Sequence, residues 1–354
     1  MLKVMSAKEE GGEMRDKRPV AEVIAKQGVA AAIGIKHVAS LLYTYRCTLA
    51  CKHCLFNCSP ARPSLHTTPD DALDYLRQLH ATDRVVHIAG GEAMMFYDDL
   101  LGICRAAGQE GIAPHFVETN ATFATSDDLA RDRLGRLREA GVLGLLISSD
   151  PYHLGLHSPA NYERCFRIAV EVFGRANVAA DELCVEALEH RSCIGRDPAK
   201  LADYTLEHPP MLVGRAGEQF SSLFPDRPVE ELIDSMWHGG QGSRDCRQEF
   251  DPDTMWEIHI DPYGNIQTCC GIILGNARLT PLPELMAGGF GGRSRIIDAV
   301  RSGGPAALLE IARGLGYEPR HGYPQKCGLC WEVRKFLRPH FPDVLGPDEI
   351  YTLG

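Results

Sequence analysis

The 354-residue sequence lacks the features that mark membrane proteins and exported proteins. No apolar run approaches the ~20 residues that a membrane-spanning helix requires. The first twenty residues are polar and contain no apolar core of the kind found in secretory signals. We therefore expect a cytoplasmic protein with no membrane partner.

An excess of basic residues is also lacking. The chain has 37 Lys and Arg against 47 Asp and Glu, which gives a formal net charge of −10. A dedicated nucleic-acid binder needs a basic face for phosphate contacts, so a nucleic-acid partner is not expected. Internal repeats and low-complexity runs are absent, and 44% hydrophobic with 24% charged residues is ordinary for a globular protein. At roughly 150 residues per domain, the length predicts about two domains.

Cysteine, by contrast, is abundant, with 13 residues. Disulfide scaffolds are short secreted chains, so in a long chain without an export signal clustered cysteines are better interpreted as metal ligands. Four cysteines stand alone in apolar or helical stretches and are expected in the core, where a free thiol packs as a small hydrophobic group: Cys104, Cys165, Cys184 and Cys193. The other nine fall into two groups.

Strand and helix signals alternate along the first two thirds of the chain. Strands are expected at 38–45, 84–89, 115–119, 144–149, 182–187 and 210–213. Helices are expected at 20–32 (ended by Gly34), 68–80, 95–109, 126–140 and 161–173. Thr68 before Pro69 is a typical N-cap, as is Ser126. Such alternation predicts βαβ units and a parallel sheet, and five or six units fall short of a complete TIM barrel. We predict an α/β fold with a partial (β/α)6 TIM-like barrel.

The pattern changes from about residue 240. Strand signals at 256–260 and 265–269 flank turn residues and predict a β-hairpin. A last helix is expected at 331–337, which makes this region a small α+β domain. We therefore divide the chain into an N-terminal extension (1–37), a barrel (38–225) and a C-terminal domain (240–340), with the boundary within 214–245.

The first cysteine group follows the first predicted strand. Cys47, Cys51 and Cys54 form a C-x3-C-x2-C array. Three thiolates can hold three irons of a [4Fe–4S] cluster and leave the fourth iron open. A zinc site or a set of buried thiols is the alternative, and zinc would take a fourth ligand from Cys58 or His53.

A Gly-Gly-Glu sequence, Gly90–Gly91–Glu92, follows the second predicted strand. The paired glycines let a ligand approach the backbone, and the carboxylate of Glu92 can bind an amine. As three isolated residues they would also suit an ordinary turn. In α/β sheets, ligands bind at the carboxyl ends of strands, where Cys47 is also expected.

This combination resembles the radical S-adenosylmethionine (SAM) superfamily, in which a C-x3-C-x-(aromatic)-C loop follows the first barrel strand and a GGE motif follows the second. The resemblance implies that Cys47, Cys51 and Cys54 bind a [4Fe–4S] cluster whose open iron is chelated by SAM. His53 takes the aromatic position beside the adenine, and Cys58 lies outside the motif. The remaining SAM contacts that it implies are Gly90, Gly91 and Glu92 for the methionine amine, with Asn120 and Ser148 or Asp150 for the carboxylate and ribose.

The second cysteine group lies in the C-terminal domain. One cysteine before the hairpin, one on it and a later C-x2-C supply four thiolates, which would close a metal site: Cys246, Cys269, Cys327 and Cys330. A zinc ribbon has a similar pattern. The order and the G-x4-C element that ends at Cys269 resemble the SPASM and twitch domains of radical SAM enzymes. That resemblance implies an auxiliary [4Fe–4S] cluster of the shorter twitch type, with Cys270 as a substitute ligand. The two resemblances cover about residues 38–335.

The resemblance also implies the reaction. The reduced cluster passes one electron to SAM, and the resulting 5′-deoxyadenosyl radical abstracts hydrogen from a C–H bond of the substrate. A flavodoxin- or ferredoxin-type protein is the expected electron donor. Asp150, Tyr152 and His153, after the fourth predicted strand, are candidate catalytic groups, and His153 or Tyr152 could exchange a proton with the substrate. An ordinary loop is an equally good interpretation of these three residues.

Three functions remain open. A small metabolite, oxidised or rearranged, is favoured because the 37 residues before the first strand are too few for a leader-peptide-binding domain. Modification of a ribosomally made peptide is the second function. The third, a non-catalytic Cys-rich metal or electron-carrier protein, does not explain the GGE sequence at a strand end.

Overall fold

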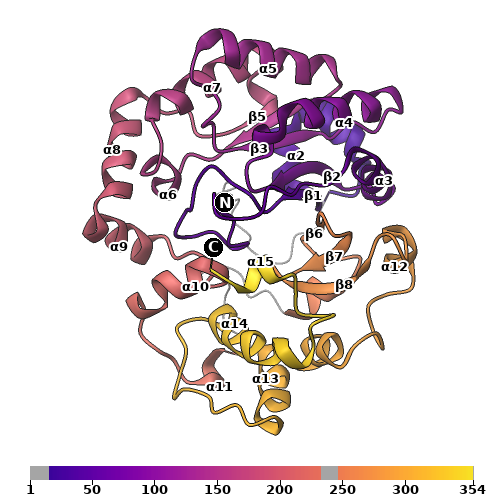
Figure 1. Cartoon of the computed structure of the whole chain (residues 1–354), viewed down its shortest axis with the longest axis vertical. Coiled ribbons are helices and arrows are strands. Elements are labelled where there is room, and N and C mark those ends of the chain that lie inside the picture. Colours follow the sequence, from indigo (N-terminus) through magenta and orange to yellow (C-terminus); the bar gives the residue numbers. More distant parts are fainter. Residues whose placement is uncertain (1–15, 233–245, 354) are drawn as a thin grey trace. The chain divides into compact units, whose positions relative to one another are not determined.

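The computed structural model describes residues 16–232 and 246–353, which form two compact units (Figure 1). The first unit comprises the described residues up to Leu49, with Pro63–Asp197 and His259–Gly264. The second comprises Ala50–Arg62, Pro198–Ile258 and Asn265 onward. The boundaries of these two units differ from the domain boundaries expected from the sequence. Residues 1–15 and 233–245 of the expected ranges lie outside the described residues. No helix of the described residues is long and apolar enough to cross a membrane.

A parallel sheet of five strands forms the centre of the first unit, in the order β5-β4-β3-β2-β1. The strands are β1 (Val38–Thr44), β2 (Val85–Gly90), β3 (Phe116–Thr119), β4 (Gly144–Ile147) and β5 (Val178–Ala179), and β6 (Glu257–Ile260) lies next to β1. All residues of β1 and β4 are buried, as is typical of parallel strands covered on both faces. The predicted α/β class is confirmed.

Helices connect these strands. They are α3 (Pro69–His80), η1 (Ala93–Phe96), α4 (Tyr97–Gln109), α5 (Asp127–Glu139), α6 (Pro151–Leu154), α7 (Pro159–Phe173), η2 (Arg175–Asn177) and α8 (Val185–Arg196). Both predicted N-caps are confirmed, since the hydroxyl groups of Thr68 and Ser126 accept bonds from the backbone N–H of Asp71 and Leu129. Helix α3 packs on α4, α4 on α5 and α5 on α7, which gives a continuous helical layer (Figure 1).

The predicted helix over 20–32 is wrong in its bounds. Two helices, α1 (Val20–Gln27) and α2 (Val29–Ile35), meet at Gly28, and Gly34 lies inside the second. Gly28 has a φ of +85°, and a Cβ there would lie 2.4 Å from the carbonyl oxygen of Ala176. The helix therefore breaks where the chain lies close to the residues just before β5. The local sequence pattern does not predict this contact.

The fifth and sixth predicted strands are also wrong. Val185 begins a helix within the predicted strand 182–187, because Glu and Ala in this run favour helix over strand. The fifth strand is instead the two-residue β5. Residues 210–213 form no strand; the N–H of Leu212 donates to Gln325 Oε1 at 3.1 Å. The barrel therefore has five parallel strands in the described residues, rather than six.

The prediction that the four isolated cysteines are buried is wrong for two of them. Cys104 and Cys165 are buried as expected, but Cys184 and Cys193 are exposed. The buried face of α8 consists of Leu188 and Ser192, so the two thiols lie away from it.

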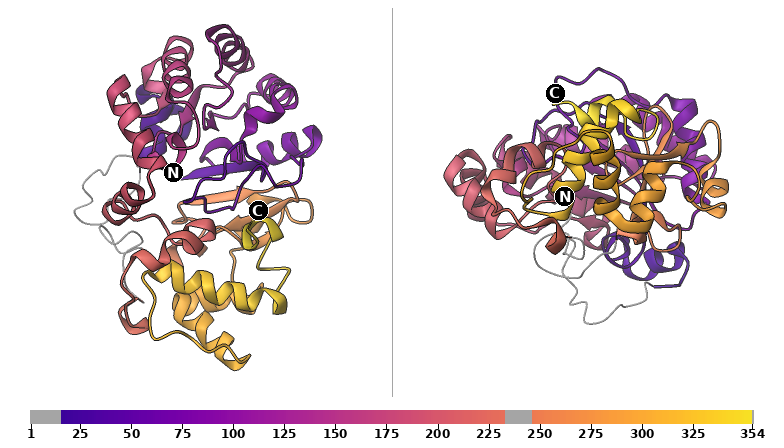
Figure 2. Two further views of the ribbon diagram at one scale, coloured as in Figure 1. Left: turned by 60° about the vertical axis from the view of Figure 1, so that its left-hand side comes forward. Right: turned by 90° about the horizontal axis from the view of Figure 1, so that it is seen from below.

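The second unit contains an antiparallel hairpin, β7 (Asn265–Thr268) with β8 (Ile272–Asn276). Its helices are α9 (Pro198–Glu207), α10 (Gly214–Phe220), η3 (Ser221–Leu223), α11 (Val229–Leu232), η4 (Cys246–Phe250), α12 (Leu282–Ala287), α13 (Arg295–Gly314), α14 (Lys326–Leu337), η5 (Arg338–His340) and α15 (Asp348–Tyr351). Helices α13 and α14 lie side by side (Figure 2).

Three features of this unit differ from the sequence-based expectation. The strands β6 and β7 are present as predicted, but β8 is an additional strand. Helix α14 begins at Lys326, five residues before the predicted start, so Cys327 and Cys330 lie on the helix itself. Helix α13 is kinked at Gly303 and Gly304, directly before Pro305.

Candidate functional site

The turn after β2 lies against the backbone segment that leads into Cys47. The N–H of Gly91 donates to the carbonyl of Thr44 at 2.7 Å, and that of Glu92 donates to Arg46 at 3.0 Å. A Cβ on Gly91 would lie 1.8 Å from the Arg46 carbonyl oxygen, so only glycine fits. Gly90 has a φ of +118°. The two glycines thus allow close contact between two backbone segments, and their predicted contact with the SAM amine stays a prediction.

The carboxylate of Glu92 joins the ends of β2 and β3. The side chain is 1% exposed. Its Oε1 accepts hydrogen bonds from Met94 N at 3.1 Å and Thr119 Oγ1 at 2.9 Å, and its Oε2 accepts from Asn120 N at 2.8 Å. Burial raises the pKa of Glu92 to about 7, although these hydrogen bonds act in the opposite direction.

Asn120 contacts the first thiol of the array. Its Nδ2 lies 3.5 Å from Cys47 Sγ and 2.9 Å from Thr48 Oγ1. A second donor to Cys47 Sγ is Leu49 N, at 3.4 Å. Two N–H donors directed at one sulfur favour the thiolate form, which is the form that binds metal.

The other two thiols of the array, Cys51 and Cys54, lie in the second unit, where Arg215 organises their loop. Its guanidinium donates to the carbonyl oxygens of Cys51 at 3.0 Å, Cys58 at 3.0 Å and Asn57 at 3.2 Å. Its backbone N–H donates to Cys54 O at 3.0 Å. Nothing in the sequence spacing pointed to this residue, because an arginine 160 or so positions away has no fixed register with the loop.

The thiol of Cys54 has a lowered pKa. Hydrogen bonding from Cys58 lowers the pKa of Cys54 to about 6, with the positive charge of Arg215 acting in the same direction and burial opposing it. The backbone N–H of Cys58 lies 3.3 Å from Cys54 Sγ. Cys58, outside the motif, therefore contacts a predicted ligand. His53 is buried in the same loop.

Asp150 and His153 form a pair at the start of α6. The Asp150 side chain caps the helix through the backbone N–H of His153, and its carboxylate lies 2.9 Å from His153 Nδ1. Tyr152 between them is 6% exposed. Ser148 contributes its backbone N–H to Thr119 O at 3.1 Å. A carboxylate at Nδ1 fixes the tautomer and the orientation of the ring.

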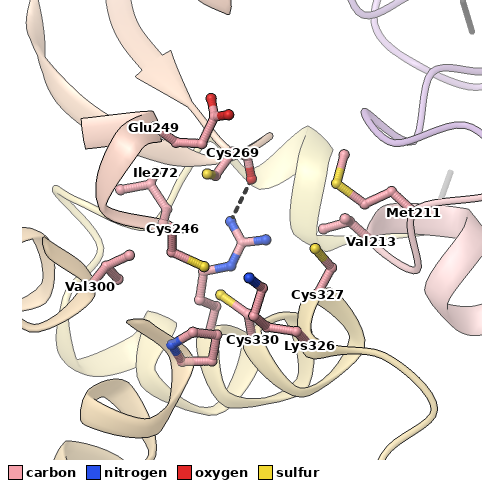
Figure 3. Close-up of a pocket in the computed structure, with 12 residues that line it drawn as sticks. Met211, Val213, Cys246, Glu249, Cys269, Ile272, Val300, Lys326, Cys327 and Cys330 are labelled. Atoms are coloured by element: carbon pink, nitrogen blue, oxygen red, sulfur yellow. Dashed lines mark hydrogen bonds between the residues drawn. The ribbon is translucent and has the colours of Figure 1, made fainter. Parts of the chain in front are cut away.

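The four cysteines of the second group line one cavity in the second unit (Figure 3). Cys246 comes from η4, Cys269 from the turn after β7, and Cys327 and Cys330 from α14. Burial raises the pKa of Cys269 and of Cys327 in the metal-free protein. Cys270 is buried but does not line the cavity.

Local backbone geometry is unusual beside two of the lining cysteines, Cys269 and Cys246. Cys269 and Cys270 have φ values of +48° and +49° in the turn between β7 and β8. Side chains other than glycine rarely adopt this left-handed region, and such residues are enriched at functional sites. At the kink of α13, a Cβ built on Gly304 would lie 3.7 Å from Cys246 Sγ, so the kink lets the helix approach that thiol.

The four thiols do not form a compact set in the metal-free protein. No three of their Sγ atoms, all in described residues, lie within 4.8 Å of one another. Four sulfurs at about 2.3 Å from one zinc would lie about 3.8 Å apart. Thiolates that bind separate irons of a cube lie farther apart, because each occupies its own corner.

The first strand of this α/β domain leads into a three-cysteine loop, and its second strand ends at a Gly-Gly-Glu turn. Residues 41–176 match the family model described as the radical SAM superfamily, and this segment is a radical SAM domain. A domain of this family implies a [4Fe–4S] cluster and SAM. The match includes the first cysteine group and the GGE sequence, and it ends before the second cysteine group.

Two solved structures are similar to the chain at low identity. The crystal structure of BtrN in complex with AdoMet and 2-DOIA has 13% identity and a TM-score of 0.39, over 76% of this chain and 88% of that one. The crystal structure of Streptococcus suis SuiB has 14% identity and a TM-score of 0.32, over 83% and 75%. No curated protein matches the sequence.

Proposed function

We propose that the protein is a radical SAM enzyme that abstracts hydrogen from a C–H bond of a small metabolite, which it oxidises or rearranges. The observation that carries this proposal is the family match over residues 41–176, which includes the C-x3-C-x2-C array and the GGE sequence. The N–H donors directed at Cys47 Sγ and Cys54 Sγ support thiolate ligands in that array.

In this proposal, Cys47, Cys51 and Cys54 hold the [4Fe–4S] cluster, and SAM binds at the open iron. When bound, the two groups supply one-electron cleavage of SAM and a radical able to abstract hydrogen. The protein's own contribution is to fix the loop and the strand ends. Arg215 holds the carbonyls around Cys51 and Cys54, while Glu92 holds the start of the segment that contains Asn120. A flavodoxin- or ferredoxin-type donor is the partner proposed for reduction.

His153 is proposed to accept or donate a proton on the substrate side. Asp150 holds Nδ1 and so fixes the tautomer and the ring orientation. A residue in this role needs an ordered ring, and the Asp150 cap at the start of helix α6 provides that order. Tyr152 is the alternative proton donor of the same turn.

The second proposed metal group is an auxiliary [4Fe–4S] cluster held by the cysteines of the cavity. Two observations support a bound anionic metal group: the four thiols line one cavity, and the cavity also contains Lys326 and Arg334. An iron–sulfur cube with four thiolates is an anion, which two neighbouring cations stabilise. Four thiols match the shorter, twitch type, and that type favours a small-molecule substrate over a peptide.

Metal analysis of a variant without the first array tests this proposal. The wild type, reconstituted anaerobically, should contain about eight irons per chain. Combined Cys47→Ala, Cys51→Ala and Cys54→Ala changes should leave about four, with an EPR signal on reduction, and should abolish release of 5′-deoxyadenosine from SAM. Full SAM cleavage by this variant would contradict the assignment of the array. One zinc per chain and no colour would contradict the auxiliary cluster.

A further inference from the structure

The four-cysteine cavity contains a buried cation without a protein anion. Arg334 lies on α14, one turn after Cys330, and is 2% exposed. Its Nη1 donates to Cys269 O at 3.0 Å, drawn in Figure 3, and to Cys270 O at 3.2 Å. The hydroxyl of Tyr351 is a further, weaker acceptor at 3.4 Å. Within the described parts of the chain, no carboxylate forms an ion pair with the guanidinium.

The Nε–H of Arg334 is also unsatisfied. This nitrogen is buried and has no hydrogen-bond partner in residues 16–232 and 246–353. Arginine remains protonated inside proteins, and buried charges and donors are costly unless they are paired. Among the described residues, the guanidinium thus lacks a negatively charged partner, and its Nε–H lacks an acceptor. A negatively charged sulfur species in the cavity would supply both.

The cavity contains two further charged side chains. Lys326, also 2% exposed, is a second cation, and Glu249 is the one carboxylate of the lining. Because Lys326 precedes Cys327 directly on α14, both cations are fixed to the helix that supplies two of the thiols. Their positions therefore depend on the fold and not on a mobile loop.

We propose that Arg334 sets the redox potential of the cluster in this cavity, with its Nε–H donating to a ligand thiolate or cluster sulfide. This inference rests on the proposed auxiliary cluster. Reduction adds one negative charge to the cluster, and a fixed positive charge beside it stabilises the reduced form. Hydrogen bonds to the sulfurs act in the same direction. Arg334 is a positioning residue, and it makes this cluster an easier electron acceptor.

The test uses the full-length chain with the first array removed (Cys47→Ala, Cys51→Ala and Cys54→Ala), so that any cluster signal comes from the cavity. EPR-monitored redox titration then gives its midpoint potential. Arg334→Gln should shift the oxidised-to-reduced equilibrium at least about ten-fold towards the oxidised form, which is about 59 mV for one electron. Arg334→Lys keeps the charge but loses the Nε–H, so it should shift the equilibrium in the same direction by a smaller factor of about two to five.

Lys335→Gln is the matched control. Lys335 is the next residue on the same helix, but its side chain is 36% exposed and pairs with Glu218. Loss of this screened charge should change the equilibrium by less than about two-fold. Iron bound at an unchanged midpoint in Arg334→Gln would overturn the inference and leave the auxiliary cluster in place. If Arg334→Gln does not bind iron, the midpoint potential of Arg334→Lys is the deciding measurement. A midpoint potential equal to that of Lys335→Gln overturns the inference. A lower midpoint potential supports it. Zinc or no metal in the three-alanine parent refutes the cluster proposal itself, and this inference with it.

Discussion

Replacing the Glu92 carboxylate with an amide tests whether this side chain supports the site or binds the ligand. In Glu92→Gln, one of the two side-chain oxygens becomes an NH2 group. Oε1 faces Met94 N and Thr119 Oγ1, and Oε2 faces Asn120 N. Either orientation of the amide therefore places NH2 against a backbone N–H. At least one of the two backbone amides, Met94 or Asn120, must lose its acceptor.

The size of this loss can be estimated and measured. A buried N–H without an acceptor costs about 1–3 kcal/mol, or about five- to 140-fold in a local opening equilibrium. We expect hydrogen exchange at Met94 or Asn120 to accelerate at least about five-fold, measured by mass spectrometry at pH 8, where the wild-type carboxylate is ionised. Glu110→Gln is the control, because Glu110 is an exposed partner of Arg77. Exchange as slow as in the wild type at both amides would refute the supporting role.

The same variant measures direct binding of SAM. A carboxylate has about four acceptor sites, and three of those of Glu92 are occupied. One site remains for an ammonium group, and a charge-assisted bond there is worth about 1.5–3 kcal/mol. We therefore expect the SAM dissociation constant to rise about ten-fold or more at intact iron content. An unchanged constant would make the GGE sequence a structural turn alone.

Three shorter predictions follow from the same unit. Because burial raises the pKa of Glu92 from 4.5 to about 7, the native state binds more protons between these values, and stability should fall by up to about 3 kcal/mol as the pH rises through that window. Denaturant unfolding of the metal-free protein should show this slope in the wild type and not in Glu92→Gln. Asn120→Ala removes a hydrogen-bond donor to Cys47 Sγ, a contact worth about 0.5–1 kcal/mol. The midpoint potential of the first cluster should therefore fall by roughly 20–40 mV in an EPR-monitored titration. An unchanged midpoint potential would contradict this contact. A thiol reagent should label the exposed Cys184 and Cys193 in the folded protein and leave the buried Cys104 and Cys165 unlabelled, as peptide mapping can show.

Local sequence signals predicted the parts of the fold that depend on neighbouring residues. Thr68 and Ser126 cap their helices through their own side chains, and a cap is readable within four residues. The four longer barrel strands were predictable because their apolar runs are bounded by turns. The two strands that were predicted wrongly, at 182–187 and 210–213, are short segments with weak periodicity. At 210–213 a tertiary contact of Leu212 with Gln325 decides the structure, and at 182–187 the helix preference of Glu and Ala decides it.

The grouping of the cysteines was predictable from their order along the chain, but their surroundings were not. Four thiols from separate segments do line one cavity, as the order along the chain indicated. Arg334 and Arg215 had no sequence signal, because their main partners are backbone carbonyls far away in the chain. Buried arginines of this kind become visible only when burial and hydrogen bonding are known together. The electrostatics of the site therefore had to come from the structure.

Gly91 provides the sharpest test of how the two motifs depend on each other. In Gly91→Ala, the new Cβ would lie 1.8 Å from the Arg46 carbonyl oxygen, a distance that real Cβ atoms do not reach. The obstacle is backbone, so no rotamer change relieves it, and the segment before Cys47 must shift. We expect the variant to lose most of the iron of the first cluster and to stop cleaving SAM. Gly102→Ala, on the exposed face of α4 with no atom within 4 Å of the new Cβ, should instead keep its iron and gain up to about 1 kcal/mol of stability. Iron analysis and calorimetry of the pair separate a local clash from a general effect of adding a methyl group. Full iron content and normal SAM cleavage in Gly91→Ala would mean that the contact between the GGE turn and the cysteine loop does not hold the site together.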